Sequence, residues 1–160
     1  MIVISDTSPL NYLVLIELEG ILPALFGEIV LPTAVFEELH SAAAPEKLRA
    51  WLGTSPRWIR IEAAPAITPD LMGLGAGERE VIALGLHSNA SLVLLDEARG
   101  RRMALERGLA VAGTLGILER AARQGMIRLS EAVDRLRHTS FRASPRLLES
   151  LREADGSELA

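Results

Sequence analysis

The chain has 160 residues, of which 49% are hydrophobic and 24% are charged, and its formal net charge is −4. This length and composition favour a single domain over residues 1–160 with a hydrophobic core of its own. The absence of cysteine excludes disulfide bonds, thiolate nucleophiles and cysteine-based metal sites, and it fits a cytoplasmic protein. We expect no membrane span, because Glu17 and Glu19 end the apolar run from Tyr12 to Ile16 far short of the roughly 20 residues that a bilayer requires.

The cations are sixteen arginines and a single lysine, Lys47. No glycine-rich loop precedes Lys47, which excludes a P-loop nucleotide site. The acidic charge balance argues against a protein that coats nucleic acid non-specifically. It is compatible with an enzyme that contacts a few phosphates through a local group of arginines.

Short apolar runs alternate with helical patterns as far as Gly125. Strands are predicted at Ile2–Ile4, Glu28–Leu31, Trp58–Ile61, Ser91–Leu95 and Leu109–Ala112. Helices are predicted at Pro9–Glu19, Leu22–Phe26, Thr33–His40, Pro45–Trp51, Gly75–Leu86, Ala98–Arg107 and Thr114–Gly125. This alternation predicts an α/β fold in which helices cover both faces of a parallel sheet. Residues 130–155 have only helical patterns, so we expect them to form a helical C-terminal extension of the domain.

An aspartate follows each of two predicted strands, Asp6 after the first and Asp96 after the fourth. In an open parallel sheet, ligands bind beyond the carboxyl ends of the strands, near the point where the strand order reverses. The two aspartates are therefore candidate site residues. The alternative is that each one only caps the helix that follows it.

Two glutamates on predicted helices are further candidates. At about 100° per residue, Glu78 shares the inward face of its helix with Val81, whereas Glu80 points away and is expected to be solvated. Glu38 borders the apolar face of an earlier helix, and Glu37 lies nearly opposite that face. A carboxylate near the core needs a partner or a cation, so Glu78 and Glu38 are the better candidates. The alternative for Glu78 is an acid that stabilises the N-terminus of its helix.

Four carboxylates gathered in one cleft would repel each other, and a divalent cation would neutralise them. His40, His87 and His138 occur singly without metal-ligand spacing, so a zinc site has no support. A set of oxygen ligands selects Mg²⁺ or Mn²⁺, which also bind phosphate oxygens. Hydrolysis of a phosphodiester is the reaction that we expect from such a site.

The arginines after Asp96 are candidate substrate ligands. Arg101 lies on the inward stripe of its predicted helix and could pair with a site carboxylate or hold a phosphate. Arg99 and Arg102 lie on the outward side, where they would contact the substrate backbone or form an ordinary solvated face. Thr114 either caps its helix or lines the cleft with its hydroxyl.

Five segments occur in an order that resembles the PIN-domain family, in particular its VapC-like prokaryotic branch. They are ISDTSPL, VFEEL, GAGEREVIALG, VLLDEARGRRMA and VAGTLGIL. The resemblance covers most of the chain. It implies a three-layer α/β/α sandwich around a mostly parallel sheet of four to five strands. It also implies an Mg²⁺- or Mn²⁺-dependent endoribonuclease, which in many members is the toxin of a toxin–antitoxin pair.

The resemblance also assigns roles to residues. The four acidic positions of the family's site match Asp6, Glu38, Glu78 and Asp96. Asp6, Glu78 and Asp96 are then expected metal ligands together with Glu97, since Asp96 and Glu97 are adjacent and either or both could serve. Arg101 matches a basic position of the branch, and Thr114 matches the hydroxyl of its Gly-Thr segment.

We therefore predict a metal-dependent endoribonuclease with RNA as substrate and an antitoxin protein as partner. The main alternative is a catalytically inactive PIN scaffold that binds proteins. A phosphatase with Asp6 as nucleophile is disfavoured, because Ser8 stands where such an enzyme needs a second acid. The helices after Ser130 could pack back on the sheet or form a homodimer through their apolar positions, which are Val133, Leu136, Leu147, Leu148 and Leu151.

Overall fold

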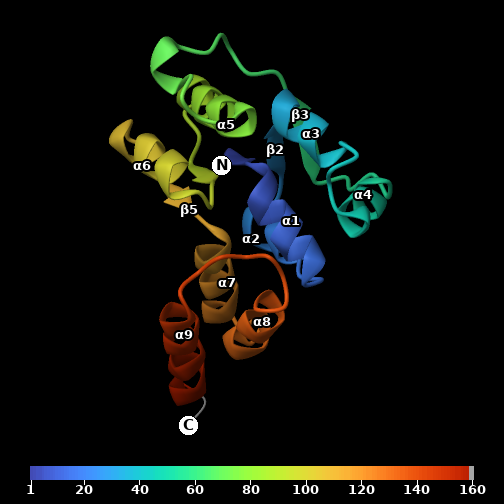
Figure 1. The fold of residues 1–160 in the computed structure, drawn as a ribbon, viewed down its shortest axis with the longest axis vertical. Helices are drawn as coiled ribbons and strands as arrows, with labels where there is room; N and C mark the ends of the chain where they lie inside the picture. The colour runs from blue at the N-terminus through green and yellow to red at the C-terminus, as the bar shows by residue number, and fades with distance from the viewer. Residues whose placement is uncertain (159–160) are drawn as a thin grey trace.

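The structure, a computed structural model, describes residues 1–158, with side chains up to residue 153. Five parallel strands form one central sheet in the order β3-β2-β1-β4-β5 (Figure 1). The strands are β1 (Val3–Ser5), β2 (Ile29–Pro32), β3 (Ile59–Glu62), β4 (Leu92–Leu94) and β5 (Val111–Ala112). The predicted parallel sheet is thus confirmed, with the third strand at one edge.

Helices connect and cover the strands. They are α1 (Thr7–Leu15), α2 (Ile21–Phe26), α3 (Thr33–Leu39), α4 (Glu46–Leu52), the 3₁₀ turn η1 (Pro69–Leu71), α5 (Ala76–Ser88), α6 (Ala98–Glu106), α7 (Thr114–Arg123), α8 (Leu129–Leu136) and α9 (Pro145–Glu158). Helix α5 packs over β1, β2 and β4, α2 packs on β2, and α7 packs on β5 and α1. The fold is the expected three-layer α/β/α sandwich. No helix in the described part of the chain has the length and apolar composition needed to cross a membrane.

The two central strands, β1 and β4, end beside each other, and this brings the polar residues that follow them together. Strands β1 and β4 are adjacent and in register, with Ser5 opposite Leu94. The chain leaves β1 toward β2 and β3 and then returns to the other side of β1 as β4, so the strand order reverses between these two strands. The backbone N–H of Asp6 donates a hydrogen bond to the carbonyl of Leu94 over 3.0 Å. The ends of β1 and β4 therefore lie side by side at the switch point of the sheet.

Two local predictions are wrong. The first helix ends at Leu15 instead of Glu19, because Glu17 adopts a positive φ of 61° and the N–H of Leu18 bonds back to the carbonyl of Leu13. Glu80 is not a solvated side chain, because its Oε1 accepts a hydrogen bond of 3.0 Å from the backbone N–H of Ala34 in the first turn of α3. Glu80 thereby joins α5 to α3.

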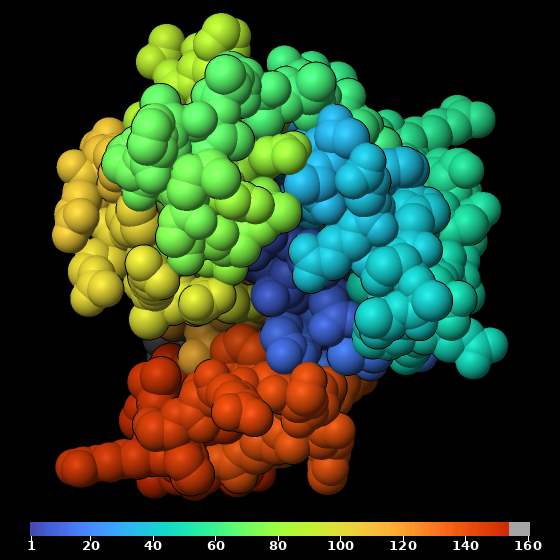
Figure 2. Space-filling view, turned by 45° about the horizontal axis from the view of Figure 1, so that its top comes forward, coloured from blue at the N-terminus to red at the C-terminus, as the bar shows by residue number. Residues whose placement is uncertain are grey.

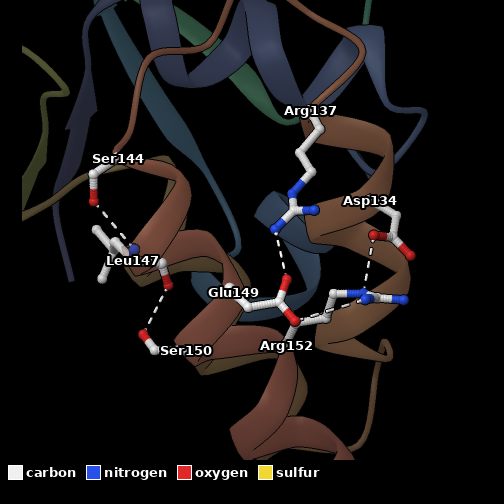
Figure 3. Close-up of polar contacts among 7 residues, drawn as sticks. All are labelled: Asp134, Arg137, Ser144, Leu147, Glu149, Ser150 and Arg152. Carbon is white, nitrogen blue, oxygen red and sulfur yellow. Dashed lines mark hydrogen bonds and ion pairs between the residues drawn. The ribbon is translucent and has the colours of Figure 1, made fainter.

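The C-terminal helices pack back on the rest of the chain mainly through helix α7, and not mainly on the sheet. Val133, Leu136 and Leu148 are buried within the same chain, and α8 contacts both α7 and α9. Ion pairs join α8 to α9, from Arg137 to Glu149 and from Arg152 to Asp134, each at 3.0 Å (Figure 3). Of the apolar positions that we considered for a dimer, Leu147 is exposed and Leu151 is partly buried.

Candidate active site

A hollow lies where β1 and β4 end. In Figure 2 the blue N-terminal segment forms its floor, and the surrounding atoms are the green of α5, the cyan of α3 and α4, the yellow of α6 and the orange-red of the C-terminal part. Asp6 stands there between β1 and α1 and is almost completely buried, with 8% exposure. Burial raises the pKa of Asp6 from 3.8 to about 6, partly offset by the N–H of Thr7 and reinforced by Glu38, Asp96 and Glu97. Three of the other predicted acids are therefore near enough to Asp6 to disfavour its negative charge.

Asp6 and Glu38 approach the same point of α5. A Cβ on Gly77 would lie 2.7 Å from Oδ1 of Asp6 and 3.4 Å from Oε2 of Glu38, so both oxygens lie within 3.4 Å of one position. Glu38 itself is exposed at the end of α3, and its Oε2 accepts a hydrogen bond from the Thr7 hydroxyl over 3.0 Å. The second predicted acid therefore lies beside the first.

Glu78 reaches the hollow from the first turn of α5. Its Oε2 lies 2.8 Å from the position of a Cβ on Gly100, and this buried oxygen has no hydrogen-bond partner. Burial first, then a hydrogen bond shared between the Glu78 and Glu97 carboxyl groups, and then the charges of Glu97, Asp6 and Glu38 raise the pKa of Glu78 from 4.5 to about 8. A buried carboxylate oxygen that has no hydrogen-bond partner and lies near other acids favours the binding of a proton or a cation.

Asp96 is held by one residue. Its Oδ1 accepts the backbone N–H of Thr114 and its Oδ2 accepts the Thr114 hydroxyl, each over 2.7 Å. Burial raises the pKa of Asp96, whereas the two bonds from Thr114 and the charge of Arg101 oppose that rise. Thr114 is fully buried and its hydroxyl bonds to Asp96, which favours a role in orienting Asp96 over lining the cleft. Its helix is preceded by Gly113, so Thr114 is the first helical residue and not the cap.

The remaining predicted residues lie around α6. Glu97 precedes the helix, is exposed, and contributes to the raised pKa of both Asp6 and Glu78. The guanidinium of Arg101 donates to the carbonyl of Leu95 over 3.4 Å and lies beside Gly113 together with Asp96, as its inward position predicted. Arg99 is exposed and its guanidinium lies against Gly73, and Arg102 is exposed on the same helix.

Sequence reasoning missed the residues that make room for the acids. Gly77, Gly100 and Gly113 stand where an added Cβ would come within 3.0 Å of Asp6, Glu78 and Asp96 respectively. Two of these glycines lie inside helices, where glycine is less favourable than alanine. A glycine within a helical pattern was therefore the feature of the sequence that could have indicated a close approach of another group.

The donor chemistry fits a hard divalent cation. Oxygen ligands come from separate segments, and Oε2 of Glu78 is buried without a partner. Among the described residues, however, no three acidic or histidine side chains are already gathered closely enough to hold a metal ion. Two of the acids are already oriented by hydrogen bonds, since Glu38 accepts one from Thr7 and Asp96 accepts two from Thr114. A cation beside them would therefore require the side chains of Glu78 and Glu97 to move toward it.

An all-parallel sheet with acids at its switch point and no histidine among them offers oxygen ligands of the kind that hard cations prefer and gives no support to a zinc site. The family model DUF3368, described as a PIN domain, matches residues 2–156. The chain belongs to the PIN-domain family, whose members are in general metal-dependent nucleases. No curated protein and no solved structure matches the chain significantly.

Proposed function

We propose that this protein is a divalent-metal-dependent endoribonuclease that hydrolyses phosphodiester bonds of RNA. The observation that carries the proposal is the convergence of carboxylates from four segments on one hollow, with an unpartnered buried oxygen on Glu78. Carboxylates that lie close together repel each other, and bound Mg²⁺ or Mn²⁺ would relieve that repulsion. Both ions also bind phosphate oxygens.

Each residue then has a role. Asp6, Glu78, Asp96 and Glu97 hold the cation, Glu38 completes the acidic wall beside Asp6, and Thr114 fixes Asp96. When bound, the ion supplies charge neutralisation and activation of the attacking water. Arg101 balances the charge of Asp96, whereas the exposed Arg99 and Arg102 contact phosphates of the RNA.

The replacement Asp6→Asn tests this proposal. It keeps the shape of a buried side chain but removes the charge nearest the other acids, so RNA cleavage in Mn²⁺ should fall by roughly 100-fold or more. The measurement is cleavage of labelled single-stranded RNA in Mn²⁺, in Mg²⁺ and in chelator. Asp134→Asn is the matched control, because Asp134 pairs with Arg152 on the C-terminal helices. Full cleavage by the Asp6→Asn variant, or equal cleavage in chelator, contradicts the proposal.

A second candidate function is a PIN scaffold without catalysis that binds other proteins. It is favoured by the lack of a ready-made metal group among residues 1–153 and by the engagement of both Asp96 oxygens. Calorimetric titration with Mn²⁺ separates the two candidates. Binding below millimolar concentration supports the nuclease, and no binding near millimolar concentration supports the scaffold.

We further propose that the protein is the toxin of a type II toxin–antitoxin pair in the cytoplasm. The resemblance to VapC-like sequences supports this role, and the acidic hollow suits an antitoxin that inserts a basic segment. A homodimer could form through the exposed Leu147 on α9. Growth arrest on expression, relieved by the protein encoded beside it, is the expected result.

A further inference from the structure

The connection between α8 and α9 is attached to the first helix of the domain. The hydroxyls of Tyr12 and Ser140 are 3.2 Å apart, and the rings of Tyr12 and Phe141 meet edge-on with centroids 5.1 Å apart. The Thr139 hydroxyl donates to the carbonyl of Leu136 over 2.7 Å and accepts the N–H of Phe141 over 3.1 Å. This segment, residues 139–142, is irregular in backbone conformation but has a defined position beside α1.

A groove of about 520 Å³ lies between this segment and the acids of the hollow. Its lining residues are Ser8, Tyr12, Asp96, Glu97, Ser140, Phe141 and Arg142. The volume is within the range of sites that bind small molecules or parts of larger ligands. The charged residues of the lining are two acids of the candidate active site and one arginine from the C-terminal extension.

Arg142 differs from Arg137 and Arg152 in its pairing. Arg137 and Arg152 pair with Glu149 and Asp134 and so fasten α8 to α9 (Figure 3). Arg142 is exposed and has no ion-pair partner within the described part of the chain. Its charge is therefore available to a ligand in the groove.

We propose that this groove binds the RNA strand next to the cleaved bond, with the guanidinium of Arg142 paired to a backbone phosphate. This inference rests on the proposed function. The acids of the site repel an RNA backbone, so a strand that enters it needs a cation close by, and guanidinium groups bind phosphate oxygens through two parallel hydrogen bonds. The hydroxyls of Ser8, Tyr12 and Ser140 add neutral hydrogen-bonding groups along the same groove. The C-terminal extension thus contributes directly to substrate binding.

The test compares Arg142→Ala and Arg142→Lys with Arg146→Ala. Arg146 is an exposed arginine in the first turn of α9 that does not line the groove, so its replacement removes the same charge from the same region. Binding of a short labelled single-stranded RNA is measured by fluorescence anisotropy, with Ca²⁺ in place of Mn²⁺ to slow cleavage. For Arg142→Ala we expect roughly five- to tenfold weaker RNA binding. The slope of the log of the association constant against the log of the salt concentration should become shallower by about 0.7, because one phosphate contact is lost. Arg142→Lys should retain most of the slope, and Arg146→Ala should match the unmodified protein.

The outcomes separate this inference from the proposed function. Unchanged affinity and salt slope in Arg142→Ala overturn the inference, while RNA cleavage by the unmodified protein in Mn²⁺ leaves the proposed function standing. Arg142-dependent RNA binding without any cleavage supports the groove and contradicts the proposed nuclease activity. If the unmodified protein binds no RNA, both are overturned. Melting curves should coincide for the three variants, because neither arginine forms an ion pair with any residue whose side chain the structure describes.

Discussion

Thr114 gives both of its hydrogen-bond donors to one carboxylate. The backbone N–H and the hydroxyl each reach a different oxygen of Asp96 over 2.7 Å, and Thr114 is fully buried while doing so. A carboxylate fixed at both oxygens has a single orientation, and it keeps lone pairs for a cation on each oxygen. Thr114 thus acts on the site through Asp96.

We expect Thr114→Val to weaken Mn²⁺ binding by roughly tenfold. Valine preserves the shape but removes the donor to Oδ2, so a buried carboxylate oxygen is left unbonded and the pKa of Asp96 rises further. The free energy of unfolding should fall by about 1–3 kcal/mol. Isothermal titration calorimetry and chemical denaturation measure the two effects.

Thr54→Val is the matched control for that substitution. The Thr54 hydroxyl is exposed and donates to the carbonyl of Trp51 over 2.6 Å, within the turn after α4. Its loss should leave the Mn²⁺ affinity unchanged. Equal Mn²⁺ affinity in Thr114→Val and the unmodified protein would show that Asp96 needs no support from Thr114.

Helix α5 lies so close to Asp6 and to helix α3 that its second residue, Gly77, has no room for a side chain. A Cβ on Gly77 would lie 2.7 Å from Oδ1 of Asp6 and 3.3 Å from Cγ2 of Val35. The closest obstacle is the end of a flexible side chain, so an added methyl group would displace the Asp6 carboxylate more easily than the helix. Packing at this position is therefore linked to the geometry of the site.

For Gly77→Ala we expect cleavage to fall by roughly 100-fold, because displacement of a site residue by about 1 Å has effects of that order. Folding should be nearly unaffected, since alanine gains about 0.5–1 kcal/mol of helix preference that offsets the local crowding. Gly116→Ala on α7 is the control, because the nearest atom to its Cβ is the Cβ of Ala112 at an ordinary 3.7 Å. Gly116→Ala should keep full activity and raise the melting temperature, and an active Gly77→Ala variant contradicts this account.

The elements differ in how far the sequence predicts them. An uninterrupted apolar run such as Leu92–Leu94 identifies a central strand, and parallel pairing then places Asp6 and Asp96 at one edge. Helical periodicity correctly predicts that Glu78 faces the other acids. It cannot predict that Glu80 accepts a hydrogen bond from the N–H of Ala34, in the first turn of another helix. The position of Arg142 could not be predicted either. Its segment is neither helix nor strand, so no hydrophobic periodicity indicates which residues its side chain lies beside.

Across the whole molecule, the acids of the hollow make stability depend on pH. The pKa of Asp6 is raised from 3.8 to about 6 and that of Glu78 from 4.5 to about 8. The folded protein therefore holds more protons than the unfolded chain between these limits, so the free energy of unfolding decreases as pH rises through them. Asp6 alone accounts for at most about 3 kcal/mol of that decrease.

In chelator, the melting temperature should consequently be higher at pH 5 than at pH 8. A site cation opposes the trend, because it binds the deprotonated acids of the folded state and adds about 2.7 kcal/mol when its concentration is 100 times its Kd. At about 2–4 °C per kcal/mol, Mn²⁺ should raise the melting temperature at pH 8 by several degrees and have little effect at pH 5.

Differential scanning calorimetry of the unmodified protein and of an Asp6→Asn, Glu78→Gln double variant checks both trends. The double variant has lost the two raised pKa values, so its melting temperature in chelator should vary less between pH 5 and pH 8. A melting temperature that rises toward pH 8 in chelator, or one that Mn²⁺ leaves unchanged there, means that the acids are already satisfied without a cation.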